Sequence, residues 1–343
     1  MTNDPGTESA PSAGAYEAVL EMVNGFWVAQ IVRTAADLSL AEHLAAGPRT
    51  AADIAAVEGA DPDATYRLMR ACASLGLLSY AGDGFASTPL LAVLNQNSPL
   101  SLKSYALAQT APGHWLTWGQ TTAAVRAGGS QAHKVLGKSI FEYFAEHPDE
   151  AALFGTAMTN LSTPVILRAV DILDVSNVKT VVDVGGADGA FVLELLARNP
   201  HLEGIVLELP HAVPGAEAAA TARGLADRCV AQAGDFFEQI PAGDLFLLKY
   251  IMHDWNDESC VRILRNCRQA MHPGSRVVIV EIVMGEQPVG IAPLMDMAML
   301  TMVSSRERTL AEFDSLLSQA GLQRTNLGEI TGSPYAVIEA TAV

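Results

Sequence analysis

The sequence predicts an α/β protein in which a mostly helical N-terminal domain precedes a parallel sheet wound with helices. From Lys179 onward, short β-branched runs alternate with helical stretches, the pattern of a doubly wound, Rossmann-like sheet. From Tyr16 to Leu100 the apolar spacing is helical instead. With 343 residues, 50% of them hydrophobic, the chain is long enough to fill the cores of two domains.

Four segments are expected along the chain. Residues 1–14 are rich in Pro, Gly, Ser and Thr and lack the basic start and apolar core of a signal peptide, so they are expected to form a disordered tail. Residues 15–105 are expected to form the helical domain. We expect 106–170 to be a helical linker that contributes to a substrate pocket, and 171–343 to be the ligand-binding α/β domain.

The helical domain has the layout of a winged helix. Thr50 and Asp61 are capping residues that each open a short helix, and residues 77–85 read as a small hairpin. A DNA-binding regulator is therefore one alternative. The candidate recognition helix, however, sets Asp61 and Asp63 against Arg67 and Arg70, which gives no basic stripe.

Composition argues against several kinds of partner. The formal net charge is −17, from 38 acidic and 21 basic residues, so phosphate backbones and anionic lipid surfaces would repel the chain. We expect neither nucleic acid nor membrane as a partner. The segment 16–32 is more apolar than one amphipathic stripe requires, which indicates burial against a second subunit and hence a homodimer.

The four cysteines are scattered, with no C-x-x-C pair and no histidine at metal-ligand spacing. They read as reduced thiols of a cytoplasmic protein, and no metal is expected.

The first predicted strand of the sheet ends in a glycine turn at 183–189, which opens a helix. Glycines there let the backbone approach a ligand closely. Counted from Gly185, the later positions of a dinucleotide fingerprint are Ala187 and Ala190, so a nicotinamide cofactor does not fit. Asp183 and Asp188 flank the turn and would repel a pyrophosphate while favouring an amino or sulfonium group.

Acidic residues also end the next two strands. Glu208 comes 25 residues after Asp183, where a carboxylate can accept two hydrogen bonds from a ribose diol. In Gly234-Asp-Phe-Phe, Asp235 can accept a bond from an adenine amine and Phe236 can pack on the ring. Adenosine together with a cation indicates S-adenosylmethionine. Each acidic residue alone could instead be a turn or helix cap.

The fourth strand leads into His253, just past the sheet, where a methyl acceptor would lie. Histidine can take a proton near neutral pH, so His253 is the candidate general base. Glu281, expected to end the fifth strand, and Glu307 could orient its ring. The alternatives are structural: His253 with Asp254 would cap the following helix, and Glu307 would cap its own.

With these residues in hand, the chain resembles the small-molecule O-methyltransferases of the plant-caffeate and bacterial-polyketide type over nearly all of residues 16–343. The family's D-V-G-G-x-x-G, acidic-Leu-Pro, G-D-F/M-F and L-K-x-x-x-H-D-W motifs occur in order at 183–189, 208–210, 234–237 and 248–255. Where the family more often has Asp before Leu-Pro, this chain has Glu208.

The resemblance implies site residues, a fold and an assembly. The expected cofactor-binding residues are Asp183, Gly185, Gly189, Glu208, Leu209, Gly234, Asp235, Phe236, Lys249 and Trp255. His253 would be the base, flanked by Glu281 and Glu307. The N-terminal winged-helix domain would form an intertwined homodimer. The acceptor pocket would be lined by Met158, Asn160, Asp254, Met295, Asp296, Met299 and Met302.

Met295, Met299 and Met302 recur at helical spacing and would serve equally well as core. The function expected is S-adenosylmethionine-dependent methylation of a hydroxyl on a small aromatic, secondary-metabolite acceptor by direct displacement. Alternatives are an N- or C-methyltransferase of the same fold, a non-methylating tailoring enzyme that uses the cofactor, and the winged-helix regulator.

Overall fold

The computed structural model describes residues 13–98, 100–287 and 290–343. The expected tail lies outside the described residues except for Ala13 and Gly14, which belong to the first helix and not to a disordered segment. The chain forms two compact units, the first comprising residues up to 111 with 152–160 and the second comprising 112–151 with 161–343. The stretch expected to be a linker, 106–170, is thus divided between the two units.

The first unit is helical apart from one hairpin. Thr50 and Asp61 cap their helices as expected, since their side chains accept hydrogen bonds from Asp53 N and Ala64 N at 3.2 and 2.8 Å. Ile54, Met69 and Phe85 lie in the unit's core. Its elements are α1 (Ala13–Asp37), α2 (Leu40–His43), α3 (Ala51–Glu58), α4 (Pro62–Ser74), β1 (Leu78–Ala81), β2 (Gly84–Ser87), α5 (Pro89–Ala92) and α6 (Lys103–Gln109).

Residues 16–28 of α1 carry an exposed apolar surface. Met22 is 77% exposed and Trp27 is 56% exposed within this chain. The other large apolar side chains exposed on this helix are Tyr16, Val19, Leu20, Val23, Phe26 and Val28.

Short helices begin the second unit before the sheet. They are α7 (Pro112–Trp118), α8 (Thr121–Ala127), α9 (Ala132–Leu136) and α10 (Ile140–Glu146), followed by the long α11 (Pro148–Ile172), whose middle belongs to the first unit.

The sheet of the second unit has the strand order β5-β4-β3-β6-β7-β10-β9. β3 to β7 are parallel, whereas β10 pairs antiparallel with both β7 and β9. The last strand was expected to run antiparallel at or near the edge, and it lies one place from the edge. The strands are β3 (Thr180–Val184), β4 (Glu203–Glu208), β5 (Cys229–Ala233), β6 (Gly243–Lys249), β7 (Met271–Met284), β8 (Arg308–Thr309), β9 (Leu322–Glu329) and β10 (Tyr335–Ala342).

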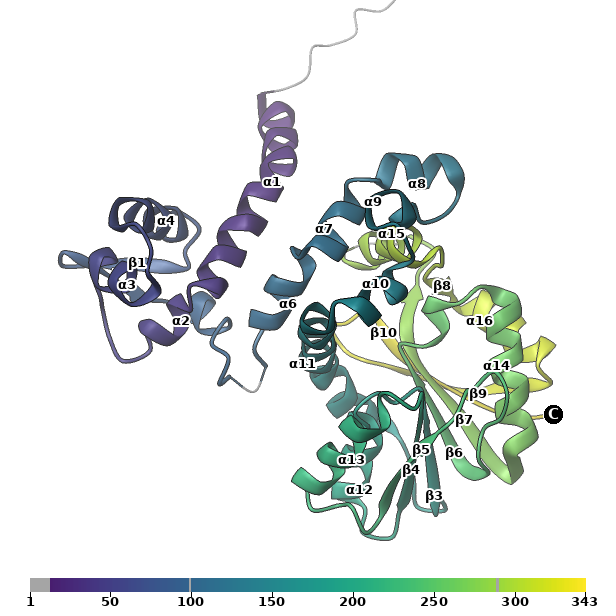
Figure 1. The fold of residues 1–343 in the computed structure, drawn as a ribbon. Helices are drawn as coiled ribbons and strands as arrows, with labels where there is room; N and C mark the ends of the chain where they lie inside the picture. The colour runs from purple at the N-terminus through teal and green to yellow at the C-terminus, as the bar shows by residue number, and fades with distance from the viewer. Residues whose placement is uncertain (1–12, 99, 288–289) are drawn as a thin grey trace, which may run out of the picture. The chain divides into compact units, whose positions relative to one another are not determined.

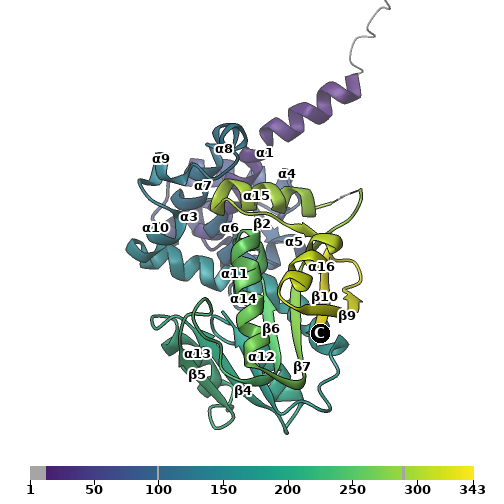
Figure 2. The ribbon, with the colours of Figure 1, turned by 90° about the vertical axis from the view of Figure 1, so that its right-hand side faces the viewer.

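Helices cover both faces of this sheet (Figures 1 and 2). Alternate residues of each strand point to opposite faces, so Val181 and Val182 lie in different cores. One core includes α12 (Ala190–Arg198), α13 (Val213–Ala222) and the end of α11; the other includes α14 (Asp257–Ala270) and α16 (Leu310–Gln319). The remaining elements are the 3-10 turn η1 (Met252–Asp254) and α15 (Ala292–Val303).

In the part of the chain that the structure describes, no helix combines the length and the apolar character that crossing a lipid bilayer would require.

Candidate functional site

The glycine turn between β3 and α12 is shaped by close contacts. Gly185 and Gly189 have φ of 69° and 74°, which favours glycine. A Cβ atom at Gly185 would lie 2.7 Å from Ile251 Cδ1 and 3.3 Å from Phe236 Cε1, and one at Gly189 would lie 2.7 Å from Val206 Cγ2. The turn therefore needs both glycines and packs against the segments that follow β5 and β6.

Asp183 lies beneath this turn and is 2% exposed. Its Oδ2 accepts a hydrogen bond from Val192 N at 3.3 Å, and its Cγ would be 2.6 Å from a Cβ at Gly186. Burial raises the pKa of Asp183 to about 6, although the charge of Lys249 acts in the opposite direction. The carboxylate thus holds the turn and places a negative charge below it.

Glu208 and Asp235 stand at the ends of the two neighbouring strands. Glu208 Oε2 accepts a hydrogen bond from Ala187 N at 3.2 Å, and Oε1 accepts one from Leu209 N at 2.9 Å. Asp235 Oδ1 accepts a bond from Phe237 N at 2.8 Å. Because β3, β4 and β5 are parallel neighbours, the three acidic residues lie along one edge of the sheet.

An aromatic cluster adjoins this edge. Phe236 and Phe237 have ring centroids 4.9 Å apart, and Phe237 meets Trp255 edge-to-face at 4.8 Å. Gly234 N bonds to the carbonyl oxygen of Glu208, which ties the end of β5 to the end of β4. Leu209, in contrast, is 45% exposed.

β6 ends in Lys249, and Tyr250 follows it. Burial lowers the pKa of Lys249, against the opposing charges of Asp183, Asp188 and Glu281. Its Nζ lies 4.3 Å from the centroid of the Tyr250 ring. Tyr250 has a φ of 59°, a conformation that costs energy in a residue with a Cβ and often marks a functional site.

His253 follows in the 3-10 turn η1, and the structure excludes its role as a helix cap. The N-cap of α14 is Asn256, whose Oδ1 accepts a bond from Ser259 N at 2.9 Å. Glu307 is not a cap either, because α16 begins with a capping box formed by Thr309 and Glu312. Both structural alternatives are therefore wrong.

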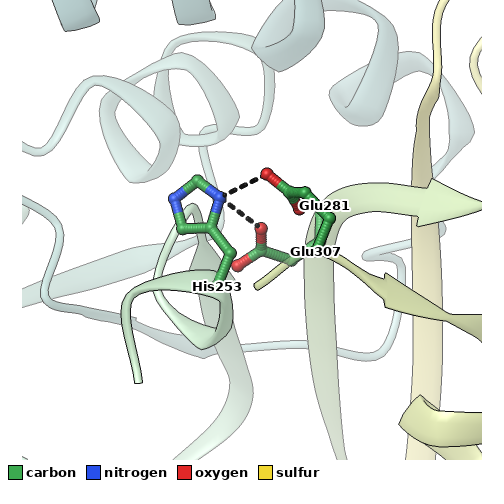
Figure 3. Close-up of side chains that lie close together, drawn as sticks. All are labelled: His253, Glu281 and Glu307. Carbon is green, nitrogen blue, oxygen red and sulfur yellow. Dashed lines mark hydrogen bonds and ion pairs between the residues drawn. The ribbon is translucent and has the colours of Figure 1, made fainter. Parts of the chain in front are cut away.

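Two buried carboxylates flank one side of the His253 ring (Figure 3). Nδ1 lies 3.0 Å from Glu307 Oε1 and 3.5 Å from Glu281 Oε2, whereas the other ring nitrogen, Nε2, points away from both. Nε2 is 3.7 Å from Asp254 Oδ1. Glu281 lies within β7 and does not end it, since the strand continues to Met284.

The charges around His253 shift the pKa values of the ring and of its carboxylate neighbours. Burial alone would lower the pKa of His253, but Glu281, Asp254 and Glu307 outweigh it and raise the pKa to about 10. Burial raises the pKa of Glu281 to about 7. The imidazolium is therefore strongly favoured once a proton reaches the ring.

Arg308 is hydrogen-bonded to both ends of the turn that carries His253. No pattern in the sequence identified this residue. It is 1% exposed and donates to the carbonyl oxygens of Met252 and Trp255, each at 2.7 Å, and to Asp257 Oδ1. Arg306, two residues earlier, is 49% exposed at its side chain. Only the fold distinguishes these two arginines.

The residues expected to line the acceptor pocket fall in different places. Asp296 Oδ1 accepts a bond from Glu307 N at 2.9 Å and so supports the loop that carries Glu307. Met302 is buried with Ile140 and Tyr143, while Met295 and Met299 of α15 are half-buried. Met158 and Asn160 belong to the first unit, where Asn160 Nδ2 donates to Ser101 O at 3.0 Å.

Comparison with known proteins matches both parts of the chain. Residues 118–323 match the family described as the O-methyltransferase domain, and residues 20–97 match the O-methyltransferase dimerisation domain. The chain is 36% identical to mitomycin biosynthesis 6-O-methyltransferase of Streptomyces lavendulae, over 98% of this chain and 97% of that protein.

Solved structures show the same likeness. The crystal structure of LaPhzM has a TM-score of 0.90 at 32% identity and covers 96% of this chain and 99% of that one. NcsB1, an O-methyltransferase from neocarzinostatin biosynthesis solved with S-adenosyl-L-homocysteine and 1,4-dihydroxy-2-naphthoic acid, has a TM-score of 0.77 at 31% identity. That match covers 92% of this chain and 96% of NcsB1.

Proposed function

Because the chain belongs to the O-methyltransferase family, we propose that it moves a methyl group from S-adenosylmethionine to a hydroxyl of a small aromatic acceptor, with His253 as general base. One observation carries the assignment of the base. His253 stands past the end of β6 with Nδ1 held between Glu281 and Glu307 and with Nε2 directed away from them. A histidine oriented by carboxylates in this way is the arrangement of a general base.

The residues at the sheet edge fit S-adenosylmethionine. The glycine turn leaves no side chain between the backbone and a ligand, and Asp183 supplies a buried negative charge below it. Glu208 is suited to the ribose hydroxyls, Asp235 to the adenine amine and Phe236 to the ring face. The bound donor supplies an electrophilic methyl carbon on a positively charged sulfur.

The proton of the acceptor hydroxyl passes to His253. With Nδ1–H donated to Glu307, the lone pair of Nε2 accepts the proton of the acceptor hydroxyl as the oxygen bonds to the methyl carbon. The bond between carbon and sulfur breaks at the same time, and its electron pair neutralises the sulfur, leaving S-adenosylhomocysteine. Glu281 and Glu307 stabilise the imidazolium that forms.

The basicity of His253 matches a phenol. An ordinary phenol has a pKa of about 10. The carboxylate neighbours raise the pKa of His253, which makes its neutral ring a stronger base toward a weakly acidic phenol. An aliphatic alcohol would be a far weaker acid, which favours an aromatic acceptor.

Met295, Met299 and Asp254 are proposed to contact this acceptor. Met295 and Met299 are half-buried on α15, and methionine adapts to flat apolar ligands. Asp254 Oδ1 lies 3.7 Å from His253 Nε2, the nitrogen assigned to the acceptor. The structure of NcsB1 with 1,4-dihydroxy-2-naphthoic acid supports an aromatic acceptor for this chain as well.

The first unit contains the family's dimerisation domain, and we propose that two copies of this chain associate through their N-terminal helices. The exposed apolar surface of α1 supports this, because a patch of that kind on one helix is typical of a protein interface.

A coupled assay for S-adenosylhomocysteine release tests this function. The panel should contain phenols, catechols and hydroxylated polycyclic acids, together with aromatic amines that lack a hydroxyl. Release that requires a hydroxylated acceptor supports O-methyl transfer, whereas release with the amines alone assigns an N-methyltransferase. Cofactor binding without release across the panel contradicts the proposal.

A further inference from the structure

Glu281 and Glu307 each have a buried oxygen that lacks a hydrogen-bond donor among the described residues. Glu281 Oε1 accepts a bond from Met252 N at 2.8 Å, and Glu307 Oε1 lies 3.0 Å from His253 Nδ1. Within the described parts of the chain, the Oε2 atoms of both carboxylates are buried without a hydrogen-bond partner. Leaving buried carboxylate oxygens unpaired is costly, so this group is suited to a further positive partner.

One hydrogen cannot satisfy both carboxylates. Nδ1 of His253 carries at most one hydrogen, yet it faces Glu307 Oε1 and, at 3.5 Å, Glu281 Oε2. One nitrogen atom and one oxygen atom from each carboxylate all lie within 4.8 Å of one another. A cation placed among the three atoms would contact each of them.

The ligand set and its charge match zinc. Zn²⁺ binds imidazole nitrogen and carboxylate oxygen at about 2.0–2.2 Å, and sites with three protein ligands keep a fourth position open. A neutral imidazole and two carboxylates carry a charge of −2, which a divalent cation neutralises. Mg²⁺ and Ca²⁺ prefer six or more oxygen ligands, so a buried site with one nitrogen and two carboxylates disfavours them.

We propose that Zn²⁺ binds His253 Nδ1, Glu281 and Glu307 and thereby inhibits the enzyme. The metal takes the place of the Nδ1 hydrogen that Glu307 accepts. A neutral ring that binds the metal through Nδ1 carries its one hydrogen on Nε2, so Nε2 has no lone pair left to accept the proton of the acceptor hydroxyl. The metal is an inhibitor here and not a cofactor. The binding is independent of the reaction, whereas the inhibition rests on the proposed function.

Cobalt provides a direct measure of binding. The full-length protein is stripped of metal with a chelator, titrated with Co²⁺ by visible absorption, and then titrated with Zn²⁺ to displace the cobalt. We expect one equivalent of Co²⁺ bound with nitrogen and oxygen ligands. A thiolate-to-cobalt charge-transfer band would instead assign the metal to a cysteine, such as the buried Cys260, and would overturn the site.

Isosteric variants locate the metal. Glu281→Gln and Glu307→Gln should each weaken Co²⁺ binding at least about tenfold, because even changes beyond the ligand shell cost about 10–100-fold. Glu58→Gln is the matched control, since Glu58 pairs with His43 far along the chain from these residues. Circular dichroism melting shows whether each variant is folded. Unchanged Co²⁺ affinity in folded Glu281→Gln and Glu307→Gln would overturn the site, as would absence of binding to the wild type.

Activity provides the second readout. Zn²⁺ should lower methyl transfer in the wild type, excess chelator should restore it, and Mg²⁺ at the same concentration should not lower it. A zinc-bound enzyme that keeps its full rate would overturn the inhibition. Binding of Co²⁺ by a protein that methylates no acceptor would leave the metal site supported while contradicting the proposed function, so the two failures are distinguishable.

Discussion

The guanidinium of Arg308 donates a 2.7 Å hydrogen bond to the carbonyl oxygen of Met252, the residue immediately before His253. A second bond reaches Trp255 O at the other end of the same turn. Glu307, the residue before Arg308, is hydrogen-bonded to the His253 ring itself. Two adjacent residues therefore fix both the backbone and the side chain of the proposed base.

Arg308→Lys should lower kcat at least about tenfold while leaving the affinity for S-adenosylmethionine nearly unchanged. Lysine cannot donate the planar set of bonds, and small displacements of a catalytic group are costly. The unpaired carbonyl oxygens should also reduce the free energy of unfolding by about 2 kcal/mol. Steady-state kinetics and denaturant unfolding measure the two effects.

Arg306→Lys is the matched control for this substitution. Arg306 is 49% exposed at its side chain and pairs with Asp257 and Glu312, and exposed pairs contribute less than about 1 kcal/mol. Equal losses of kcat in the two variants would show that Arg308 does not position the turn.

The dependence of kcat/KM on pH should follow His253. Its pKa is raised to about 10, so the ring is mostly protonated at neutral pH and the basic form increases as the pH rises. In chelator-treated buffer, kcat/KM for a phenol should rise about tenfold per pH unit between about pH 6 and 9.

Glu281→Gln should shift this rise to lower pH. The variant removes a negative charge that raises the pKa of His253, so the ring loses its proton at lower pH. The maximal rate should fall as well, because the imidazolium is less stabilised. If kcat/KM depends on pH in the same way in Glu281→Gln as in the wild type, the observed titration does not belong to His253.

Affinity for S-adenosylmethionine should fall as the pH drops through about 6. Burial raises the pKa of Asp183 to about 6, so its carboxylate is charged above this pH and neutral below it, and only the charged form attracts a cationic ligand. Calorimetric titration from pH 5 to 8 measures the effect.

Asp183→Asn should bind the cofactor weakly and without this pH dependence. Asp227→Asn is the control, because Asp227 is exposed and precedes β5, at the amino ends of the parallel strands and away from the proposed cofactor site. A pH dependence that persists in Asp183→Asn would assign the titration to another group.

Association of two chains should depend on α1. Met22 and Trp27 are 77% and 56% exposed within one chain, and a charged side chain buried in an interface is costly. Trp27→Glu should therefore shift the molar mass measured by light scattering from that of two chains to that of one. Val57→Glu, at another exposed apolar position on α3, should have no such effect; loss of association in both variants would argue against an interface at α1.

Much of this arrangement was predictable from local sequence patterns. The β-branched runs of the parallel strands, the caps at Thr50 and Asp61 and the acidic strand ends depend on nearby residues, so they could be read directly. The closeness of Asp183, Glu208 and Asp235 follows from the rule that parallel strands end at one edge.

Other features depend on contacts between distant segments. Burial of Arg308 results from carbonyl groups more than 50 residues away, and no pattern in 306–309 distinguishes it from Arg306. Glu281 lies inside β7 because the strand pairs with β10 as far as Ile282 and with β8 at Val283 and Met284. Met302 joins a cluster with residues of α10, which sequence spacing could not reveal.

His253→Ala removes the proposed base, and the assay of S-adenosylhomocysteine release measures the consequence for turnover. We expect turnover of a phenolic acceptor to fall at least about a hundredfold, the usual contribution of a general base, with little change in cofactor affinity. His272→Ala, at an exposed position in the other end of β7, should keep its turnover. Near-normal turnover in a folded His253→Ala variant would show that His253 is not the base.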